Sequence, residues 1–376
     1  MAFRVSALVR DGGLAVCGAL LLLTSACSES VPPPIGPSSL PGDKVQVLSL
    51  ACAANASRRS LDGLPVRVQY GSPMAQGGLE PVATTCTPAS GTRFPVGTNA
   101  VTCTAEDGLQ QTASCVLSVI VVPTLRVTNI MAFGDSLTAG TTASQVQTIV
   151  QLDPASSYPV KLRALLNQRY SGQSIQIVNS GLPGEFVTEA LSRLRSELSR
   201  EQPDVVIIME GTNDLSPDST SGGDSAAAAV ESMVREAKAR GADPIMATIP
   251  PQRANRATAA QVPPYNERLR QVATRENVPL VDLFQIINSG LCGDGPSVFS
   301  LPSDFRSVHT TVPCIGEDGV HPTRQGYDLI AAAFFNRIMK IYEVGSAGGS
   351  SILPQAQVPW GQPSATFGPV GTSGFR

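Results

Sequence analysis

Hydrophobic and polar residues follow two different periods in two parts of this 376-residue chain. Between residues 45 and 122, apolar side chains alternate with polar ones, as at Val66, Val68 and Tyr70. A period of two predicts β-strands, and frequent Gly and Pro residues divide the segment into about six short ones. Because helix-forming runs are absent from it, we expect segment 45–122 to form a small β-sandwich.

Segment 123–343 instead alternates apolar strands with amphipathic helices. The predicted strands lie at 127–133, 174–179, 204–209, 244–249 and 280–283. The predicted helices lie at 158–170, 187–200, 224–240, 264–276 and 323–342. Repeated strand–helix units favour an α/β fold, with a five-stranded parallel sheet in an α/β/α sandwich. The apolar run at 204–209 indicates a strand that is buried on both faces.

The two ends of the chain show neither period. Residues 1–26 contain a short basic region and an apolar stretch of about a dozen residues, which is too short to span a membrane and predicts a signal peptide. The stretch that ends at Cys27 resembles a bacterial lipobox, so we expect a lipid on Cys27 that anchors an exported lipoprotein in the cell envelope. The alternative is ordinary cleavage that leaves Cys27 free. Residues 27–44 predict a Pro/Ser-rich tether, and residues 344–376 a disordered tail.

Charge and metal-ligand content exclude two classes of function. The formal net charge is −3 and no basic stripe occurs, so the chain has no electrostatic basis for binding nucleic acid. The chain has no Cys-x-x-Cys motif and only two histidines. We therefore expect no metal site and no cofactor.

The cysteines support export. An even number of cysteines remains, six of eight, once Cys17 and Cys27 are assigned to the leader and the lipid, and in an exported chain this indicates disulfides. We expect pairing within each segment, and therefore a Cys292–Cys314 disulfide in the second one. The sequence leaves all three pairings open for the four cysteines of the first segment, which are Cys52, Cys86, Cys103 and Cys115.

Residues of three chemical types follow the predicted strands. Ser136 comes after the first strand, Gly184 after the second and Asn213 after the third. Because the carboxyl ends of parallel strands meet at one edge of a sheet, we expect all three to face one crevice. The loop before the last helix carries Asp318 and His321, and it can reach the same crevice.

These residue types fit nucleophilic catalysis. A serine hydroxyl is a weak nucleophile, and His321 can take the proton of Ser136 while Asp318 orients the imidazole. The backbone N–H groups of Ser136 and Gly184 and the side-chain amide of Asn213 can donate hydrogen bonds to an oxyanion. We interpret a second Gly-Asp-Ser, at 223–225, as a helix cap because it follows no strand.

Four blocks resemble the SGNH/GDSL hydrolases, a family of esterases and lipases with a flavodoxin-like fold. They are Gly-Asp-Ser-Leu at 134–137, Asn-Ser-Gly-Leu-Pro-Gly-Glu at 179–185, Gly-Thr-Asn-Asp at 211–214 and Asp-Gly-Val-His-Pro-Thr at 318–323. The resemblance implies that Ser136 is the nucleophile, that Gly184 and Asn213 are oxyanion donors, and that His321 and Asp318 complete a triad. Thr212 stands where many members of the family have Gly.

Segment 45–122 resembles the HYR (hyalin repeat) domain, an immunoglobulin-like module. The resemblance rests on Cys-Thr-Pro-Ala-Ser-Gly at 86–91, Phe-Pro-Val-Gly at 94–97, Val-Thr-Cys-Thr-Ala-Glu-Asp at 101–107 and Ala-Ser-Cys at 113–115. It implies an extracellular spacer or adhesion module, for which a polysaccharide or a surface protein would be the partner.

We therefore expect an exported serine esterase that resembles thioesterases and lysophospholipases, that acts on ester substrates and that is attached to a membrane through its lipid. A carbohydrate O-deacetylase with the same triad is the alternative. A hypothesis of another class is a cell-surface binding protein that uses the HYR-like domain and carries an inactive hydrolase scaffold. The complete set of catalytic residue types speaks against that third hypothesis.

Overall fold

The computed structural model describes residues 46–144, 146–218, 223–288, 298–299, 308–309 and 313–345. The predicted signal peptide, the tether with Cys27, the C-terminal tail from residue 346 and Cys292 lie outside the described residues. Within the described part of the chain, no helix is both long enough and apolar enough to cross a membrane.

The segment up to residue 122 is built from strands alone, as predicted. A four-stranded sheet has the order β2-β8-β7-β5, and β1–β4 and β3–β6 form two-stranded pairs. Eight strands are described where about six were predicted, and β3 and β6 are only two residues long. The alternation at 66–70 is therefore a strand only at its start. The strands are β1 (Ser49–Ala51), β2 (Ala56–Arg59), β3 (Val66–Arg67), β4 (Met74–Gln76), β5 (Ala83–Thr87), β6 (Arg93–Phe94), β7 (Gly97–Glu106) and β8 (Thr112–Val122).

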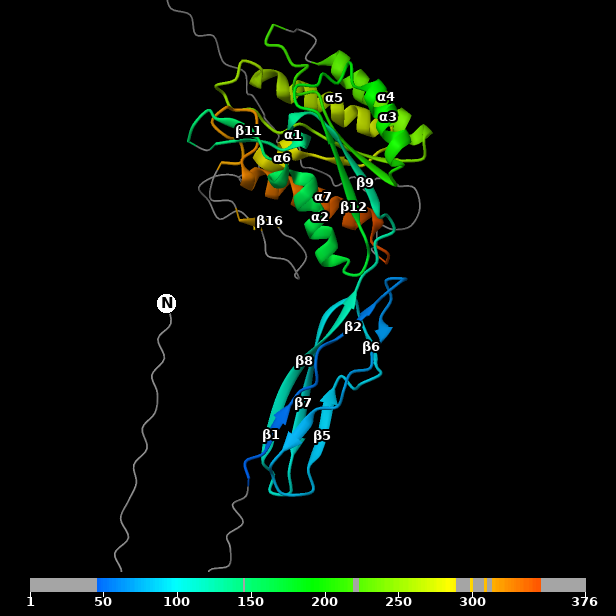
Figure 1. Cartoon of the computed structure of the whole chain (residues 1–376), viewed down its shortest axis with the longest axis vertical. Coiled ribbons are helices and arrows are strands. Elements are labelled where there is room, and N and C mark those ends of the chain that lie inside the picture. Colours follow the sequence, from blue (N-terminus) through cyan, green and yellow to red (C-terminus); the bar gives the residue numbers. More distant parts are fainter. Residues whose placement is uncertain are drawn as a thin grey trace, which may run out of the picture. The chain divides into compact units, whose positions relative to one another are not determined.

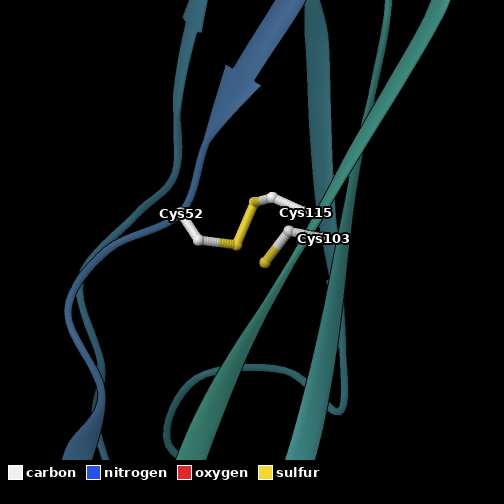
Figure 2. A group of neighbouring side chains, drawn as sticks. All are labelled: Cys52, Cys103 and Cys115. Carbon is white, nitrogen blue, oxygen red and sulfur yellow. A yellow bond between two sulfur atoms is a disulfide. The ribbon is translucent and has the colours of Figure 1, made fainter.

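Two disulfides cross this β-rich region, Cys52–Cys115 and Cys86–Cys103. Cys103 of β7 lies opposite Cys86 of β5 on one side and opposite Cys115 of β8 on the other. Figure 2 shows the sulfur of Cys103 beside the Cys52–Cys115 bond, and the three sulfurs lie within 4.8 Å of one another. All three are in disulfides and have no thiolate to offer a metal. The structure thus selects one of the three pairings that the sequence left open.

The second segment contains the predicted five-stranded parallel sheet, in the order β12-β9-β13-β14-β15. This is the flavodoxin-like order, in which the chain reverses direction across the sheet next to its first strand. The described strands begin and end within a few residues of the predicted ones. They are β9 (Asn129–Gly134), β12 (Gln176–Gly181), β13 (Val205–Met209), β14 (Asp243–Ala247) and β15 (Leu280–Val281).

Helices cover both faces of this sheet, with α2 and α7 on one side and α3, α4 and α5 on the other (Figure 1). Two short strand pairs and two 3-10 turns complete the described part of the segment. The helices are α1 (Ser136–Ala139), α2 (Tyr158–Arg169), α3 (Leu191–Glu201), α4 (Asp224–Ala239), α5 (Val262–Arg275), α6 (Leu283–Ile286) and α7 (Arg324–Tyr342), with 3-10 turns η1 (Pro154–Ser156) and η2 (Ala259–Gln261). The hairpin strands are β10 (Thr141–Ala143), β11 (Val150–Leu152), β16 (Val298–Phe299) and β17 (Val308–His309).

Alternation along the strands divides the core into two clusters. In β13, Ile207 packs toward α2 and α7, whereas Val206 and Ile208 pack toward α3, α4 and α5. Every residue of β13 is buried, which confirms the strand buried on both faces. Helix α3 begins four residues later than predicted, because Glu189 and Ala190 donate to the carbonyls three residues before them, in tighter turns than an α-helix makes.

Candidate active site

The turn after β9 places Ser136 at the edge of the sheet. Asp135 is the N-cap of α1, and its carboxylate accepts a hydrogen bond of 2.8 Å from the N–H of Leu137. A side chain at Gly134 would place a Cβ 2.4 Å from the Met209 carbonyl oxygen, so the turn requires glycine there. The cap is Asp135, which leaves the Ser136 hydroxyl available for chemistry.

The second Gly-Asp-Ser does begin a helix, α4, but it does not cap that helix with a side chain. Gly223 occupies the N-cap position with φ +82°, and the side chain of Asp224 pairs with Arg268. The predicted helix start is therefore confirmed, and the predicted side-chain cap is wrong. A left-handed backbone at the cap favours glycine over Asp or Ser.

Ser136, His321 and Asp318 form a continuous hydrogen-bonded chain. The Ser136 Oγ lies 2.9 Å from Nε2 of His321, and Nδ1 of His321 lies 2.6 Å from Oδ2 of Asp318. With its Nδ1 proton donated to Asp318, His321 has Nε2 free to accept the Ser136 proton. The Asp318 Oδ1 also accepts the N–H groups of Val320 and His321, which fixes the carboxylate in its turn.

The carboxylate of Asp318 is held in its charged form. Partial burial opposes ionisation, but the hydrogen bond from the His321 ring, the charge of that ring and two backbone N–H groups outweigh it and lower the pKa of Asp318. A charged Asp318 can stabilise the imidazolium that forms when His321 takes a proton.

Three backbone hydrogen bonds from other loops position the turn that carries Asp318 and His321. The N–H of Ala143 donates to the Pro322 carbonyl at 3.2 Å, and the N–H of Glu317 donates to the Ser144 carbonyl at 2.9 Å. On the other side, the N–H of Arg253 donates to the Gly319 carbonyl at 2.9 Å. The β10–β11 hairpin and the loop after β14 thus hold this turn from two sides.

Asn213 is bonded to the residue that follows Gly184. The Asn213 Nδ2 donates to the backbone carbonyl of Glu185 at 2.9 Å, which leaves its second N–H available. Gly184 has φ +80°, and a Cβ there would have nothing within 4 Å. The left-handed backbone conformation favours glycine at this position.

Two acids near these loops are buried, and the sequence analysis did not single out the second of them, Glu210. Burial raises the pKa of Asp135 to about 6, against the opposing hydrogen bond from Leu137. Burial, with the neighbouring charges of Asp135 and Glu185, raises the pKa of Glu210 to about 11, so Glu210 is neutral at pH 7. The signal in the sequence was an acidic residue directly after the apolar strand β13.

The remaining predicted site residues lie partly outside the described part of the chain. Cys314 is disulfide-bonded, while Cys292 lies outside the described residues, so their pairing stays a prediction. The lipid on Cys27 also stays a prediction, for the same reason. The group of potential metal ligands in the described residues is the disulfide-bonded set Cys52, Cys103 and Cys115.

Comparisons with known proteins agree with the two resemblances. The model of the GDSL-like lipase/acylhydrolase family matches residues 132–329, and that of the HYR domain matches residues 49–121. None of the curated proteins compared with the chain matches it.

Similar solved structures include a lipase/acylhydrolase from Enterococcus faecalis, with 23% identity and a TM-score of 0.44 over 58% of this chain and 100% of that one. The acetylxylan esterase Axe2 from Geobacillus stearothermophilus has 21% identity and a TM-score of 0.42, over 57% of this chain and 96% of that one. The psychrotrophic esterase EstA from a Pseudoalteromonas species has 19% identity and a TM-score of 0.39, over 56% of this chain and 96% of that one.

The family match spans more than half of the 376 residues and includes all four blocks that bring Ser136, Gly184, Asn213 and His321 to one edge of the sheet. The chain therefore belongs to the GDSL-like lipase/acylhydrolase family of ester hydrolases.

Proposed function

We propose that the protein is an exported serine esterase that cleaves carboxylic esters through an acyl-enzyme on Ser136. The observation that carries this proposal is the hydrogen-bonded chain from Ser136 through His321 to Asp318, at 2.9 Å and 2.6 Å. A binding protein with an inactive hydrolase scaffold would have no need of this alignment.

The reaction follows from the geometry. The Ser136 Oγ attacks the ester carbonyl while His321 Nε2 takes its proton, and the imidazolium is stabilised by the Asp318 carboxylate. The carbonyl oxygen becomes an oxyanion, which accepts hydrogen bonds from the N–H groups of Ser136 and Gly184 and from the free N–H of Asn213. The proton on His321 then passes to the leaving alcohol, and water repeats the sequence to release the acid.

Apolar side chains on both sides of the site favour a substrate with an apolar acyl chain. Leu182 and Phe186, which flank Gly184 in sequence, are 46% and 48% exposed. The β10–β11 hairpin, which is bonded to the turn carrying His321, exposes Ile149 and Leu152 among its large hydrophobic residues. Exposed apolar groups gathered near a reactive centre are typical of a surface that binds apolar ligands. They support a thioesterase- or lysophospholipase-like activity over carbohydrate O-deacetylation.

The location of the protein is consistent with export. The two disulfides of the β-rich region indicate an extracytoplasmic compartment, because disulfides persist where the environment is oxidising. We further propose a membrane anchor through lipid on Cys27. Replacing Cys27 with Ala should move the protein from the membrane fraction to the soluble fraction of the producing cell, and an unchanged distribution would place the anchor elsewhere.

A substrate panel tests the proposed function. Purified protein is assayed on p-nitrophenyl esters from acetyl to dodecanoyl, on acyl-CoA thioesters and on acetylated xylan, and a fluorophosphonate probe reports on Ser136. We expect kcat/KM to rise with chain length beyond acetyl, and the probe to label wild-type protein but not Ser136→Ala. Activity confined to acetyl groups on the polysaccharide would replace the proposal with the O-deacetylase. Absence of both turnover and labelling would overturn the esterase itself.

A further inference from the structure

Arg193, on α3, makes an unusual set of contacts for a residue outside the four blocks. Its Nε donates to Oε1 of Glu185 at 2.7 Å, and its Nη2 donates to the other oxygen of that carboxylate. Its Nη1 donates to the Ser180 carbonyl at 2.8 Å, and Nη2 also lies 3.4 Å from the Gly134 carbonyl. The guanidinium carbon lies 3.9 Å from the centre of the Phe133 ring. The carboxylate of Glu185 thus uses the charge and the forked N–H groups of the guanidinium, and the Phe133 ring uses its flat face. Among the side chains, only arginine combines these three properties.

The groups that Arg193 holds belong to the segments that carry the oxyanion donors. Gly134 lies two residues before Ser136, and Glu185 directly follows Gly184. The backbone carbonyl of Glu185 in turn accepts the hydrogen bond from Asn213. Glu185 is thus bonded to Arg193 through its side chain and to Asn213 through its backbone. One guanidinium therefore connects the three segments on which the proposed donors stand.

The segment around Gly184 is open on one side and is held on the other by a small set of hydrogen bonds and one ion pair. A Cβ at Gly184 would meet nothing within 4 Å, and the side chains of Leu182 and Phe186 are about half exposed. One backbone bond joins the turn to the end of β9, from the Leu182 N–H to the Gly134 carbonyl, and one closes the turn itself, from the Glu185 N–H to the Leu182 carbonyl. In contrast to Leu182 and Phe186, the side chain of Glu185 is 8% exposed and that of Arg193 is 22% exposed. This partly buried ion pair fastens the segment to the domain together with two other side chains, Asn213 on the Glu185 carbonyl and Asp214 on the Val187 N–H.

We propose that Arg193 is a positioning residue for the oxyanion hole, which it holds through Glu185 and the carbonyls of Ser180 and Gly134. The proposal rests on the assignment of Gly184 and Asn213 as oxyanion donors. An error of about 1 Å in a catalytic group can lower a rate by about 10²-fold. Releasing Glu185 should therefore lower kcat, while substrate binding changes little because Arg193 touches no reacting atom.

The test compares Arg193→Gln with Arg195→Gln, in steady-state kinetics on a short p-nitrophenyl ester. Arg195 lies on the same helix, but its side chain is 52% exposed and pairs with Glu236. We expect Arg193→Gln to lower kcat by about 10- to 100-fold with KM within about twofold, and Arg195→Gln to match wild type. A change confined to KM, or an equal effect of both variants, would overturn the proposal.

Two further measurements separate positioning from folding. In an Asn213→Ala background, Arg193→Gln should lower kcat by a much smaller factor than it does in wild type. The reason is that the oxyanion hole positioned by Arg193 already lacks one donor. Guanidinium ion at non-denaturing concentration should partly restore kcat to Arg193→Ala and leave Arg195→Ala unaffected. Additive losses and no rescue would show that Arg193 only stabilises the fold and would overturn the proposal.

Failure of the proposed function would look different. A wild-type protein that turns over no ester would overturn the oxyanion assignment and this proposal together. An active wild type in which Arg193→Gln behaves like Arg195→Gln would overturn this proposal alone.

Discussion

The β-rich region and the α/β region of this chain are stabilised in different ways. The β-rich region buries a small apolar cluster, which includes Val101, Leu117 and Val119, and crosses it with two disulfides. Most residues of strand β5 are exposed. The α/β region has two larger clusters, one on each face of a sheet whose central strand β13 is fully buried. The first region depends on covalent links and the second on packing.

This difference explains where chemistry can take place. A densely packed region can bury ionisable groups, and the α/β region does so with Asp135 and Glu210. Such groups can be held in chosen protonation states and orientations, which catalysis requires. The one buried acid among the described residues of the β-rich region, Asp107, accepts backbone N–H groups of Leu79, Leu109 and Gln111 and so holds a turn. Four changes, taken in order of expected effect, test this contrast.

Ser136→Ala should lower kcat by roughly 10⁶-fold, as the loss of a triad nucleophile does. Because the Ser136 hydroxyl contacts the rest of the domain through its hydrogen bond with His321, the melting temperature should stay near that of wild type. Steady-state kinetics and thermal unfolding on the same sample check both parts. A near wild-type rate would move the chemistry away from this edge of the sheet.

Asn213→Ala should lower kcat by about 10²- to 10³-fold with KM little changed, because an oxyanion donor acts mainly in the transition state. Asn167→Ala, at an exposed position of α2, is the matched control and should leave both constants unaltered. A pure KM effect would make Asn213 a substrate-binding residue instead.

Replacing Cys52 and Cys115 with Ser should destabilise the β-rich region while kcat stays unchanged. In the chain-entropy model, the loss is about 4 kcal/mol for residues 63 apart in sequence and about 3 kcal/mol for Cys86 and Cys103, which are 17 apart. Limited proteolysis of the β-rich region, followed with an esterase assay, measures both properties. If activity fell in step with proteolysis, the two regions would not be independent in the way their cores suggest.

Glu210→Gln should make the protein less sensitive to alkaline pH. Since the folded-state pKa of Glu210, about 11, lies above its ordinary value of 4.5, the folded chain keeps a proton that the unfolded chain releases. The stabilisation is complete below pH 4.5 and is lost as pH rises toward 11, by up to about 1.4 kcal/mol per pH unit. Unfolding in urea at pH 6, 7.5 and 9 should show a gain of Glu210→Gln over wild type that grows with pH. A gain independent of pH would mean that Glu210 is ionised in the folded protein.

The sequence determined the fold class and the candidate residues, because both are local patterns. The apolar run of β13 and the amphipathic helices predicted the parallel sheet, because the buried face of each element sets the spacing of its apolar residues. The blocks around Ser136, Asn213 and His321 each follow a strand or precede a helix, and parallel strands bring their ends together. Predicted element ends were less accurate, as at α3, where Glu189 and Ala190 form tighter turns before the helix begins at Leu191.

Only the tertiary structure decided which distant groups meet. The four cysteines of the β-rich region allow three pairings by composition, and the folded region has one of them, Cys52–Cys115 with Cys86–Cys103. The contacts of Arg193 with Glu185 and two carbonyls join segments that no short-range pattern connects. The raised pKa of Glu210 depends on burial and on carboxylates supplied by other loops. Local patterns record how each segment buries its own apolar face, whereas these contacts exist only after the segments have packed together.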